Sequence, residues 1–418
     1  MIERGVDEAF AAFAGGGLGV FNFAQRILAS LRNRYRSAKE VVDLLDQNEK
    51  VVKAAALLHD IGHGPFSHLM ERAFPSLADH EGRTIDLIKA PESSLPHILS
   101  QAGIEPQAVC DLIGKTAPYR LLVDIVSSQL DADRMDYILR DALSTGVKYG
   151  AFDAEWLLNC LCIGSEPSAA TPTPAPPQSW RLCLDEKRGL YSAEQLVIAR
   201  VHMSLQVYFH KTTRAWEAHL LCLFKLAADL AAKDDLPGAT SQLIRHFLSA
   251  KGKLGHQDFL LFDEAALTAA FQAWAAAAEP RYNLLSELSR GYLTRQKSFR
   301  HRDLEPLDFR KATKLQQEFA KHGRESIDWY LDEIKFNSYK DFGAVFKSTK
   351  QMEDEEQAMA VSTSAILLAG ESLGSRSKPV ESRSQLFDAM GGDPIKSIIR
   401  LYFHRSLESE VSKILASM

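Results

Sequence analysis

The sequence predicts a mainly α protein with a small α+β portion toward its C-terminal end. Three observations support this fold class. Residues 18–32 place their apolar side chains on one helical face: Val20, Phe23, Ala24, Ile27, Leu28 and Leu31. Residues 192–290 show helical periodicity over most of their length. The late runs "AILLAG" and "SIIRLYFH" are short and apolar, which is typical of strands.

Further elements are expected on either side of these segments. Helices are predicted over 47–58, 66–73 and 120–145, and "SLESEVSKILASM" predicts a closing helix. The stretch "WRLCLDEKRGLY" predicts two short strands around a turn. The alanine-rich "DEAALTAAFQAWAAAAEP" predicts a helix that Pro280 stops. The first helix is expected to begin near Leu18, after a flexible start at Gly15–Gly17.

These elements divide the chain into four predicted segments. Residues 1–155 form a compact helical core, and 156–185 hold the excursion "GSEPSAATPTPAPPQ" and the predicted hairpin. Residues 186–300 form a helical extension that completes the active site, and 301–418 form the α+β region.

Composition narrows the function classes. The 418 residues carry 49 Lys and Arg against 54 Asp and Glu, a net charge of −5, which gives no general attraction to nucleic acid or an anionic membrane. No run reaches the roughly 20 apolar residues of a spanning helix, and no secretory signal is recognised. The five cysteines are scattered, without a CxxC pair. We therefore expect a cytoplasmic protein without membrane contact.

Residues 57–68, "LLHDIGHGPFSH", concentrate residues with metal and acid–base chemistry. His59 and Asp60 are adjacent, and the glycines and the proline that follow end the helix, so that a cavity can open beside both side chains. A neutral imidazole and a carboxylate suit a divalent ion such as Fe, Mn, Zn, Ni, Co or Mg. Four histidines fall between positions 59 and 80, which is more than structural histidines explain.

A third ligand is expected in "SSQLDADRMDYILRDALSTG". There Asp131, Asp133 and Asp136 alternate with Arg134 and Arg140. One carboxylate can close a metal site while Arg134 offers a positive charge to phosphate oxygens. A salt-bridged surface helix is the alternative interpretation of the same pattern.

Together these segments resemble the HD-domain phosphohydrolases, and more closely their deoxynucleoside triphosphate triphosphohydrolase branch, which includes dGTPases and the sterile-alpha-motif/HD enzyme. The resemblance rests on "LLHDIGHGPFSH", "DHEGRT", "SSQLDADRMDYILRDALSTGVKYG" and "QVYFHKTTR". It implies a helical HD-domain core and a protein that hydrolyses a dNTP to deoxynucleoside and triphosphate. It also implies a homo-oligomer, a dimer or a multiple of it.

The resemblance also implies roles for individual residues. The metal ligands would be His59, Asp60 and Asp133. The catalytic group would comprise His63 and His80 along the phosphates, His68 as general acid, and Glu71 behind it. Substrate would be bound by Arg134, Tyr137, Asp141, Tyr208, His210 and Lys211.

The sequence departs from the family at its first metal ligand. Family members carry a pattern like Arg-Phe-x-His-Ser-Leu-Gly-Val before this helix, and here the run is "FAGGGLGV". Gly16 occupies the histidine position. Three protein ligands plus water can still hold a catalytic ion, but the loss of an imidazole should weaken it.

Two other functions therefore stay open beside a nucleotide phosphohydrolase. The first is a degenerate HD-domain protein that binds nucleotides or regulates, with weak or no catalysis, which Gly16 favours. The second is a phosphodiesterase or nuclease, for which the basic stretch 295–314 is the only indication. That stretch is more simply a solvated face, so a nucleic-acid partner is not the expectation.

Overall fold

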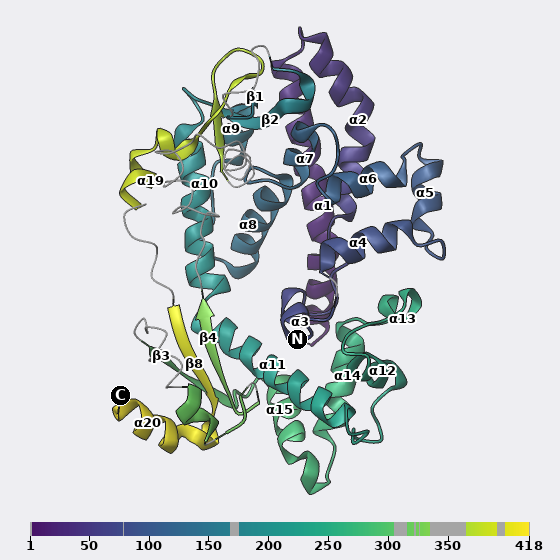
Figure 1. Ribbon diagram of the computed structural model, residues 1–418, viewed down its shortest axis with the longest axis vertical. Coiled ribbons are helices and arrows are strands. Elements are labelled where there is room, and N and C mark those ends of the chain that lie inside the picture. Colours follow the sequence, from purple (N-terminus) through teal and green to yellow (C-terminus); the bar gives the residue numbers. More distant parts are fainter. Residues whose placement is uncertain are drawn as a thin grey trace. The chain divides into compact units, whose positions relative to one another are not determined.

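The computed structural model describes residues 2–77, 79–167, 175–304, 316–321, 323–325, 327–334, 365–390 and 398–417. Helices dominate, and the two sheets are small, so the predicted mainly α fold class is confirmed (Figure 1). Within these residues, no helix combines the length and the hydrophobicity that crossing a bilayer requires.

Contacts group the chain into two compact units that alternate along the sequence. Unit 1 comprises Met1–Gly62, Glu81–Leu205 and Asn337–Pro394, and unit 2 comprises His63–His80, Gln206–Phe336 and Ile395–Met418. The four segments predicted from the sequence stay a prediction about domains. Each unit is described here by itself.

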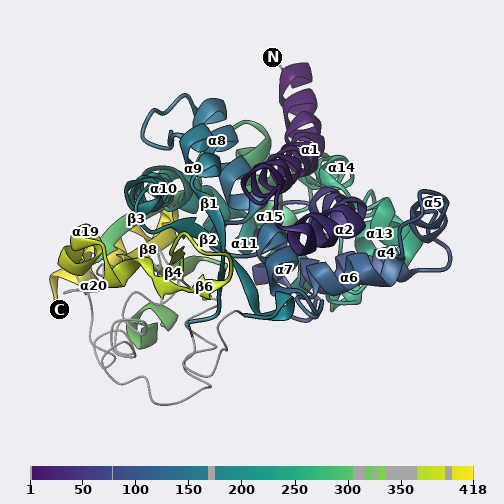
Figure 2. The same ribbon diagram turned by 90° about the horizontal axis from the view of Figure 1, so that it is seen from above.

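The helices of unit 1 pack around two long ones. α1 (Ile2–Arg34) contacts both α2 (Lys39–Leu58) and α8 (Ala132–Thr145) (Figure 2). The remaining helices are α4 (His80–Lys89), α5 (Leu95–Gln101), α6 (Pro106–Ile113), α7 (Arg120–Val126), α9 (Ala154–Asn159), α10 (Leu190–Met203) and α19 (Gln385–Met390). The apolar face predicted for residues 18–32 is buried, since Ala24, Ile27 and Leu31 have no exposed surface.

The expected start of the first helix is wrong. α1 begins at Ile2 and runs through Gly15–Gly17 without a break, so these glycines are not a helix start. Tertiary packing outweighs the poor helix propensity of glycine here. A Cβ at Gly17 would lie 2.8 Å from the carbonyl oxygen of Leu57 in α2, a separation that only glycine allows.

The helix predicted over 120–145 is two helices. α7 ends at Val126, and α8 begins after Asp131, whose carboxylate accepts a hydrogen bond from the backbone N–H of Arg134. An aspartate in this N-cap position satisfies an otherwise unpaired helix donor and favours a new helix start. The break places Asp133 in the first turn of α8.

A five-stranded sheet completes unit 1, in the order β6-β1-β2-β5-β7. Its strands are β1 (Leu161–Ser165), β2 (Trp180–Asp185), β5 (Leu367–Ala369), β6 (Ser375–Arg376) and β7 (Lys378–Pro379). The hairpin predicted within "WRLCLDEKRGLY" is therefore wrong: β2 pairs with the earlier β1, and α10 begins at Leu190. β1 is fully buried, as is β2, which explains why neither shows alternating polarity.

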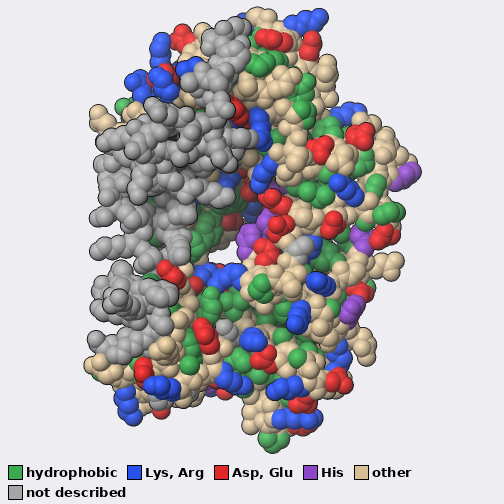
Figure 3. All heavy atoms as spheres, in the orientation of Figure 1, with side chains coloured by type: hydrophobic (Ala, Val, Ile, Leu, Met, Phe, Trp, Pro, Cys, Tyr) green, Lys and Arg blue, Asp and Glu red, His purple; other side chains and the backbone are tan. Residues whose placement is uncertain are grey.

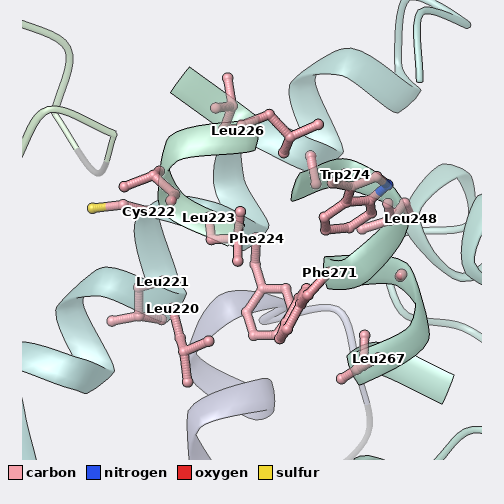
Figure 4. Packing of buried hydrophobic residues seen from close by; sticks show 14 of the residues in the cluster. Leu220, Leu221, Cys222, Leu223, Phe224, Leu226, Leu248, Leu267, Phe271 and Trp274 are labelled. Atoms are coloured by element: carbon pink, nitrogen blue, oxygen red, sulfur yellow. The ribbon is translucent and has the colours of Figure 1, made fainter. Parts of the chain in front are cut away.

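Unit 2 is built on α11 (Lys211–Ala231), which contacts α3 (His68–Ala73) and α15 (Asn283–Leu293). Among the further helices described for this unit are α12 (Gln242–Ser249), α13 (His256–Leu260) and α14 (Glu264–Ala275). Phe224, Phe271 and Trp274 lie at the centre of its apolar core (Figure 4). α14 ends five residues before Pro280, close to the predicted stop.

The helical run predicted from 192 onward is interrupted. A π-helical turn covers Ser204–Tyr208, and α11 begins anew after His210, whose ring accepts a hydrogen bond from Thr212 N–H. The second sheet has the order β3-β8-β4, from β3 (Phe299–Leu304), β8 (Ile398–His404) and β4 (Trp329–Ile334). "SIIRLYFH" is thus a strand as predicted, and α20 (Glu408–Ala416) is the predicted closing helix.

Candidate metal centre and histidine cluster

His59 stands at the end of α2, where it is the C-cap residue. Its Nδ1 lies 2.9 Å from the carbonyl oxygen of Ala56, one turn back. A carbonyl can only accept, so Nδ1 carries a hydrogen, and Nε2 is the ring nitrogen that is left to bind a metal. This is the arrangement of a histidine that binds a metal through Nε2 and is oriented through Nδ1.

Two carboxylates face the Nε2 atom of His59. Asp60 Oδ2 lies at 3.3 Å and Asp133 Oδ1 at 3.5 Å, and the donor atoms of the three residues lie within 4.8 Å of one another. Burial alone would lower the pKa of His59, but the hydrogen bonds that its ring donates to Asp133 and Asp60, together with the charges of these carboxylates, raise it to about 11. The site therefore favours a cation between these carboxylates. One nitrogen and two carboxylate donors fit a divalent transition ion.

A buried threonine fixes the turn that carries His59 and Asp60. The hydroxyl of Thr84 in α4 donates to the carbonyl oxygen of His59 at 3.0 Å and accepts from the backbone N–H of Gly62 at 2.9 Å. Thr84 has no exposed surface. Sequence reasoning missed this residue, since a single threonine on a short helix carries no distinguishing signal.

The start of α8 positions Asp133 and Arg134. The Asp131 carboxylate accepts from the backbone N–H of Ser128 at 2.8 Å and of Arg134 at 2.7 Å, and it also pairs with the Arg134 guanidinium. Asp131 is buried, so it serves as a structural anchor. Asp133 keeps a third of its side chain exposed and is the carboxylate of this segment that reaches His59.

The following turns of α8 hold the predicted sugar-binding residues. Burial raises the pKa of the Tyr137 hydroxyl, which therefore stays a neutral hydrogen-bonding group. Arg140 pairs with Asp136 through Nε at 2.9 Å, and its Nη1 lies 3.6 Å from Asp141. Substrate contact by Tyr137 and Asp141 stays a prediction.

A second group of donors lies in unit 2, formed by His63, His68, Glu71 and His80. Glu71 joins two of the rings, with Oε2 3.2 Å from His68 Nδ1 and Oε1 3.2 Å from His80 Nδ1. The rings of His63 and His80 are stacked with centroids 4.0 Å apart. Histidine and acidic side chains also lie close together on the surface seen in Figure 3. We call these four residues the histidine cluster.

The turn that precedes His68 in the chain has a strained backbone. Phe66 has φ 59° and Ser67 has φ 47°, and neither is a glycine. Consecutive residues with positive φ cost free energy that the surroundings must supply. Phe66 provides an anchor, since its ring lies 6.0–6.5 Å from those of Phe224, Phe271 and Tyr292, and its N–H donates to Glu264 at 3.2 Å. The aromatic residue in "GPFSH" was a signal that sequence reasoning did not use.

The last predicted binding residues lie at the start of α11. His210 caps this helix, Tyr208 ends the π-helical turn, and the carbonyl of Lys211 accepts from the Tyr402 hydroxyl at 3.4 Å. The Nδ1 atom of His210 is thus occupied by the hydrogen bond that caps the start of α11. Contact of these three side chains with a substrate stays a prediction.

Residues 18–115 match the family described as HD domain. This stretch contains His59 and Asp60, so the chain carries an HD domain with a divalent-metal donor set. The match and the similarities that follow agree with the resemblance to the HD-domain phosphohydrolases that the motifs indicated.

Two curated relatives show how far the similarity extends. The chain is 34% identical over 252 residues to the uncharacterized protein YwfO of Bacillus subtilis, covering 60% of this chain and 53% of that one. It is 28% identical over 131 residues to the deoxynucleoside triphosphate triphosphohydrolase SAMHD1 homolog of Dictyostelium discoideum, covering 27% of this chain and 24% of that one. The chain spans about half the length, or less, of these relatives.

One solved structure matches nearly the whole fold. A phosphohydrolase from Bacteroides thetaiotaomicron superposes with a TM-score of 0.65 over 93% of this chain and 87% of that one, at 23% identity. At this identity the likeness concerns the fold. It extends the similarity well beyond the HD domain, into the segments on which unit 2 is built.

Proposed function

We propose that this chain is a metal-dependent phosphohydrolase that acts on nucleotides, and that it hydrolyses a dNTP to deoxynucleoside and triphosphate. The observation that carries the proposal is the arrangement around His59: Nδ1 is committed to Ala56, and Nε2 faces Asp60 and Asp133. The HD-domain match supports the hydrolase, and the similarity to the Dictyostelium triphosphohydrolase supports the substrate.

His59, Asp60 and Asp133 would hold the divalent ion. When bound, such an ion supplies Lewis-acid chemistry that polarises a phosphoryl oxygen and makes water a better nucleophile. The protein's part is to keep the His59 ring in one tautomer and orientation, through Ala56, and to keep the turn in place, through Thr84.

The histidine cluster would supply the proton chemistry. The bond between the α-phosphorus and the 5′ oxygen breaks as the water oxygen bonds to phosphorus, and His68 gives its proton to the departing 5′ oxygen. Glu71 holds His68 at Nδ1, which leaves Nε2 to face the substrate. His63, His80, Arg134 and Lys211 would bind the phosphates, where fixed donors stabilise the developing negative charge.

The remaining residues would recognise the sugar. Tyr137 and Asp141 on α8, and Tyr208 and His210 before α11, are proposed to contact the deoxyribose. We also propose that the protein assembles as a homo-oligomer, a dimer or a multiple of it, because closed symmetric assemblies are the common case. Sedimentation at micromolar concentration tests this, and a clean monomer would contradict it.

A nucleotide-binding or regulatory protein without turnover is the second candidate. The observation that favours it is Gly16, which offers no ligand where the resembling family has histidine. Metal content separates the two candidates, because a tightly held stoichiometric ion that is lost in Asp60→Ala, and is therefore bound at His59, favours the enzyme.

The decisive experiment is a product analysis. Protein loaded with Mn²⁺ is incubated with each dNTP and each NTP, and products are separated by ion-exchange chromatography. We expect deoxynucleoside and triphosphate in equal amounts from at least one dNTP. The absence of any phosphate-containing product, with the metal occupancy confirmed, would overturn the proposal. Bis(4-nitrophenyl) phosphate in parallel tests phosphodiesterase activity.

A further inference from the structure

We propose that the histidine cluster is itself a metal site, for a zinc-like ion distinct from the ion at His59, and that filling it switches the enzyme off. The first part stands on the geometry of His63, His68, Glu71 and His80. The second part rests on the proposed function, because it concerns the proton that His68 would donate.

The donors are already close enough to share an ion. One ligand atom from each of the four residues lies within 4.8 Å of the others. Three imidazoles on a tetrahedral zinc ion, with bonds of about 2.0–2.1 Å, have ring centroids about 5 Å apart. In the cluster, the centroids lie 4.9 Å apart for His63 and His68 and 5.1 Å apart for His68 and His80. Only the stacked His63–His80 pair, at 4.0 Å, must open by about 1 Å to match this geometry.

The scaffold around the donors is preorganised. Glu71 and His68 lie one turn apart on α3, and Leu69 and Met70 of that helix are buried in the core of unit 2. His80 is tied to the same carboxylate twice, since its backbone N–H donates to Glu71 Oε1 at 3.0 Å and its Nδ1 lies 3.2 Å away. All four donors belong to one short stretch of chain. Binding an ion therefore requires rotation of side chains without movement of helices.

Access and charge also suit an ion. About 69% of the His68 side chain is exposed, which leaves a path from solvent, while Glu71 and His80 are each about 21% exposed. With neutral imidazoles, the cluster carries one negative charge from Glu71. A divalent ion would thus be partly neutralised on binding.

The donor set predicts which ions bind. Three nitrogens and one carboxylate favour Zn²⁺, Co²⁺, Ni²⁺ and Cu²⁺, whereas Mg²⁺ prefers oxygen ligands and retains its water. The site at His59 has the opposite balance, with one nitrogen and two carboxylates. Mg²⁺ or Mn²⁺ at activating concentrations should leave the cluster empty, and zinc should fill it.

Occupancy removes the general acid. An imidazole nitrogen that binds a metal uses the lone pair on which it would otherwise carry a proton. A metal-bound His68 cannot take up the second proton that makes an imidazolium an effective acid near neutral pH, so turnover should fall as zinc binds. A drop in free zinc would restore activity, which makes the cluster a reversible metal sensor.

Binding is tested without reference to activity. In Asp60→Ala/Asp133→Ala, which lacks the first site, Co²⁺ is titrated and its visible absorption recorded. We expect one equivalent with the strong bands of tetrahedral cobalt, and at least tenfold weaker binding after His68→Ala is added. His246→Ala is the matched control, since His246 forms a comparable pair with Asp258 at 3.1 Å elsewhere in unit 2.

If the double variant does not fold, the stoichiometry is measured in the wild-type background. Two equivalents of Co²⁺ are expected for the wild-type protein and for His246→Ala, and one for His68→Ala. A folded protein that binds no ion outside the first site would overturn the metal site. Equal binding with and without His68 would overturn it too.

Inhibition is then measured with the Mn²⁺-loaded enzyme and increasing zinc. Turnover should fall in step with occupancy of the cluster and recover on chelation. Full turnover with the cluster filled would overturn the switch. Cobalt binding in a protein that hydrolyses no nucleotide would uphold the metal site and overturn the proposed function, so the two failures are distinguishable.

Discussion

Gly19 of α1 lies directly against Asp136 of α8, and a Cβ atom at position 19 would overlap the Asp136 carboxylate. Asp136 is largely buried and pairs with Arg140 one turn later. The two helices can approach this closely only because residue 19 has no side chain. Since α8 also carries Asp133, this contact sets the position of a candidate metal ligand.

Gly19→Ala should lower the free energy of unfolding by roughly 1–3 kcal/mol, the usual cost of overpacking. This loss would exceed the gain of about 1 kcal/mol in helix propensity. Gly16→Ala is the matched control, because its Cβ would find its nearest neighbour, Arg140 Nη2, at 3.5 Å. Denaturant unfolding of both variants checks the result, and equal destabilisation would contradict it.

Asp60→Ala should weaken metal binding by more than about tenfold. Mutation of a residue that only hydrogen-bonds to a metal ligand already costs about that much affinity, and Asp60 is proposed as a ligand itself. Turnover should be lost with it. Asp46→Ala is the control, because Asp46 forms a surface pair with Arg32 in the same unit. Metal content and turnover are measured on the same samples, and unchanged turnover in Asp60→Ala would refute the site.

Gly16→His should strengthen binding of a zinc-like ion severalfold. The family resemblance places a ligand at this position, and the structure directs its Cβ toward Arg140, on the helix that carries Asp133. The guanidinium of Arg140 must move aside, which limits the gain. A competitive chelator titration compares Gly16→His with Gly16→Ala. Equal affinities would show that position 16 is not part of the site.

Ser67→Gly should stabilise the protein by about 1 kcal/mol, because glycine adopts the positive φ of residue 67 at little cost. Ser67→Ala keeps the strain and removes only the hydroxyl, so it should bring no gain. Thermal unfolding of both variants gives the comparison. A gain of the same size in Ser67→Ala would show that the hydroxyl, and not the backbone, is the source.

Acid should destabilise unit 2 through His219. Burial lowers the pKa of this residue, whose Nε2 is bonded to the Leu288 carbonyl at 2.8 Å. The unfolded state then binds more protons than the folded state, so stability is full above about pH 6.5 and declines as the pH falls below it. His219→Gln keeps a donor for Leu288 and cannot titrate. Its unfolding free energy should change less between pH 7.5 and 5.5 than that of the wild-type protein.

The fold class could be predicted from the sequence because the spacing of apolar residues reflects which side chains are buried. The apolar face of residues 18–32, the end of the second helix at Leu58 and the late strand in "SIIRLYFH" all follow from local patterns. The errors arise where contacts between segments far apart in the sequence determine the local structure. Helix α1 continues through its glycines because α2 and α8 pack against it, and β2 pairs with β1 across a gap in the sequence.

The candidate site was predictable to the extent that its donors lie within motifs. His59, Asp60 and Asp133 were named from the sequence, and the structure brings their ligand atoms together. The residues that hold these ligands in place are not part of any recognisable sequence motif. Thr84 is a lone threonine, Ala56 acts through its carbonyl, and the strain at Ser67 is a property of the backbone that composition does not reveal.

The alternation of the two units along the chain has a consequence for synthesis on the ribosome. The sheet of unit 1 takes β1 and β2 from the middle of the sequence and β5, β6 and β7 from near its end. The sheet of unit 2 likewise cannot form without β8, which pairs with both β3 and β4. Neither sheet can be completed until these distant strands have been synthesised, although domains commonly fold as they emerge. Until then the nascent polypeptide keeps unpaired strand edges, which make a folding intermediate prone to aggregation.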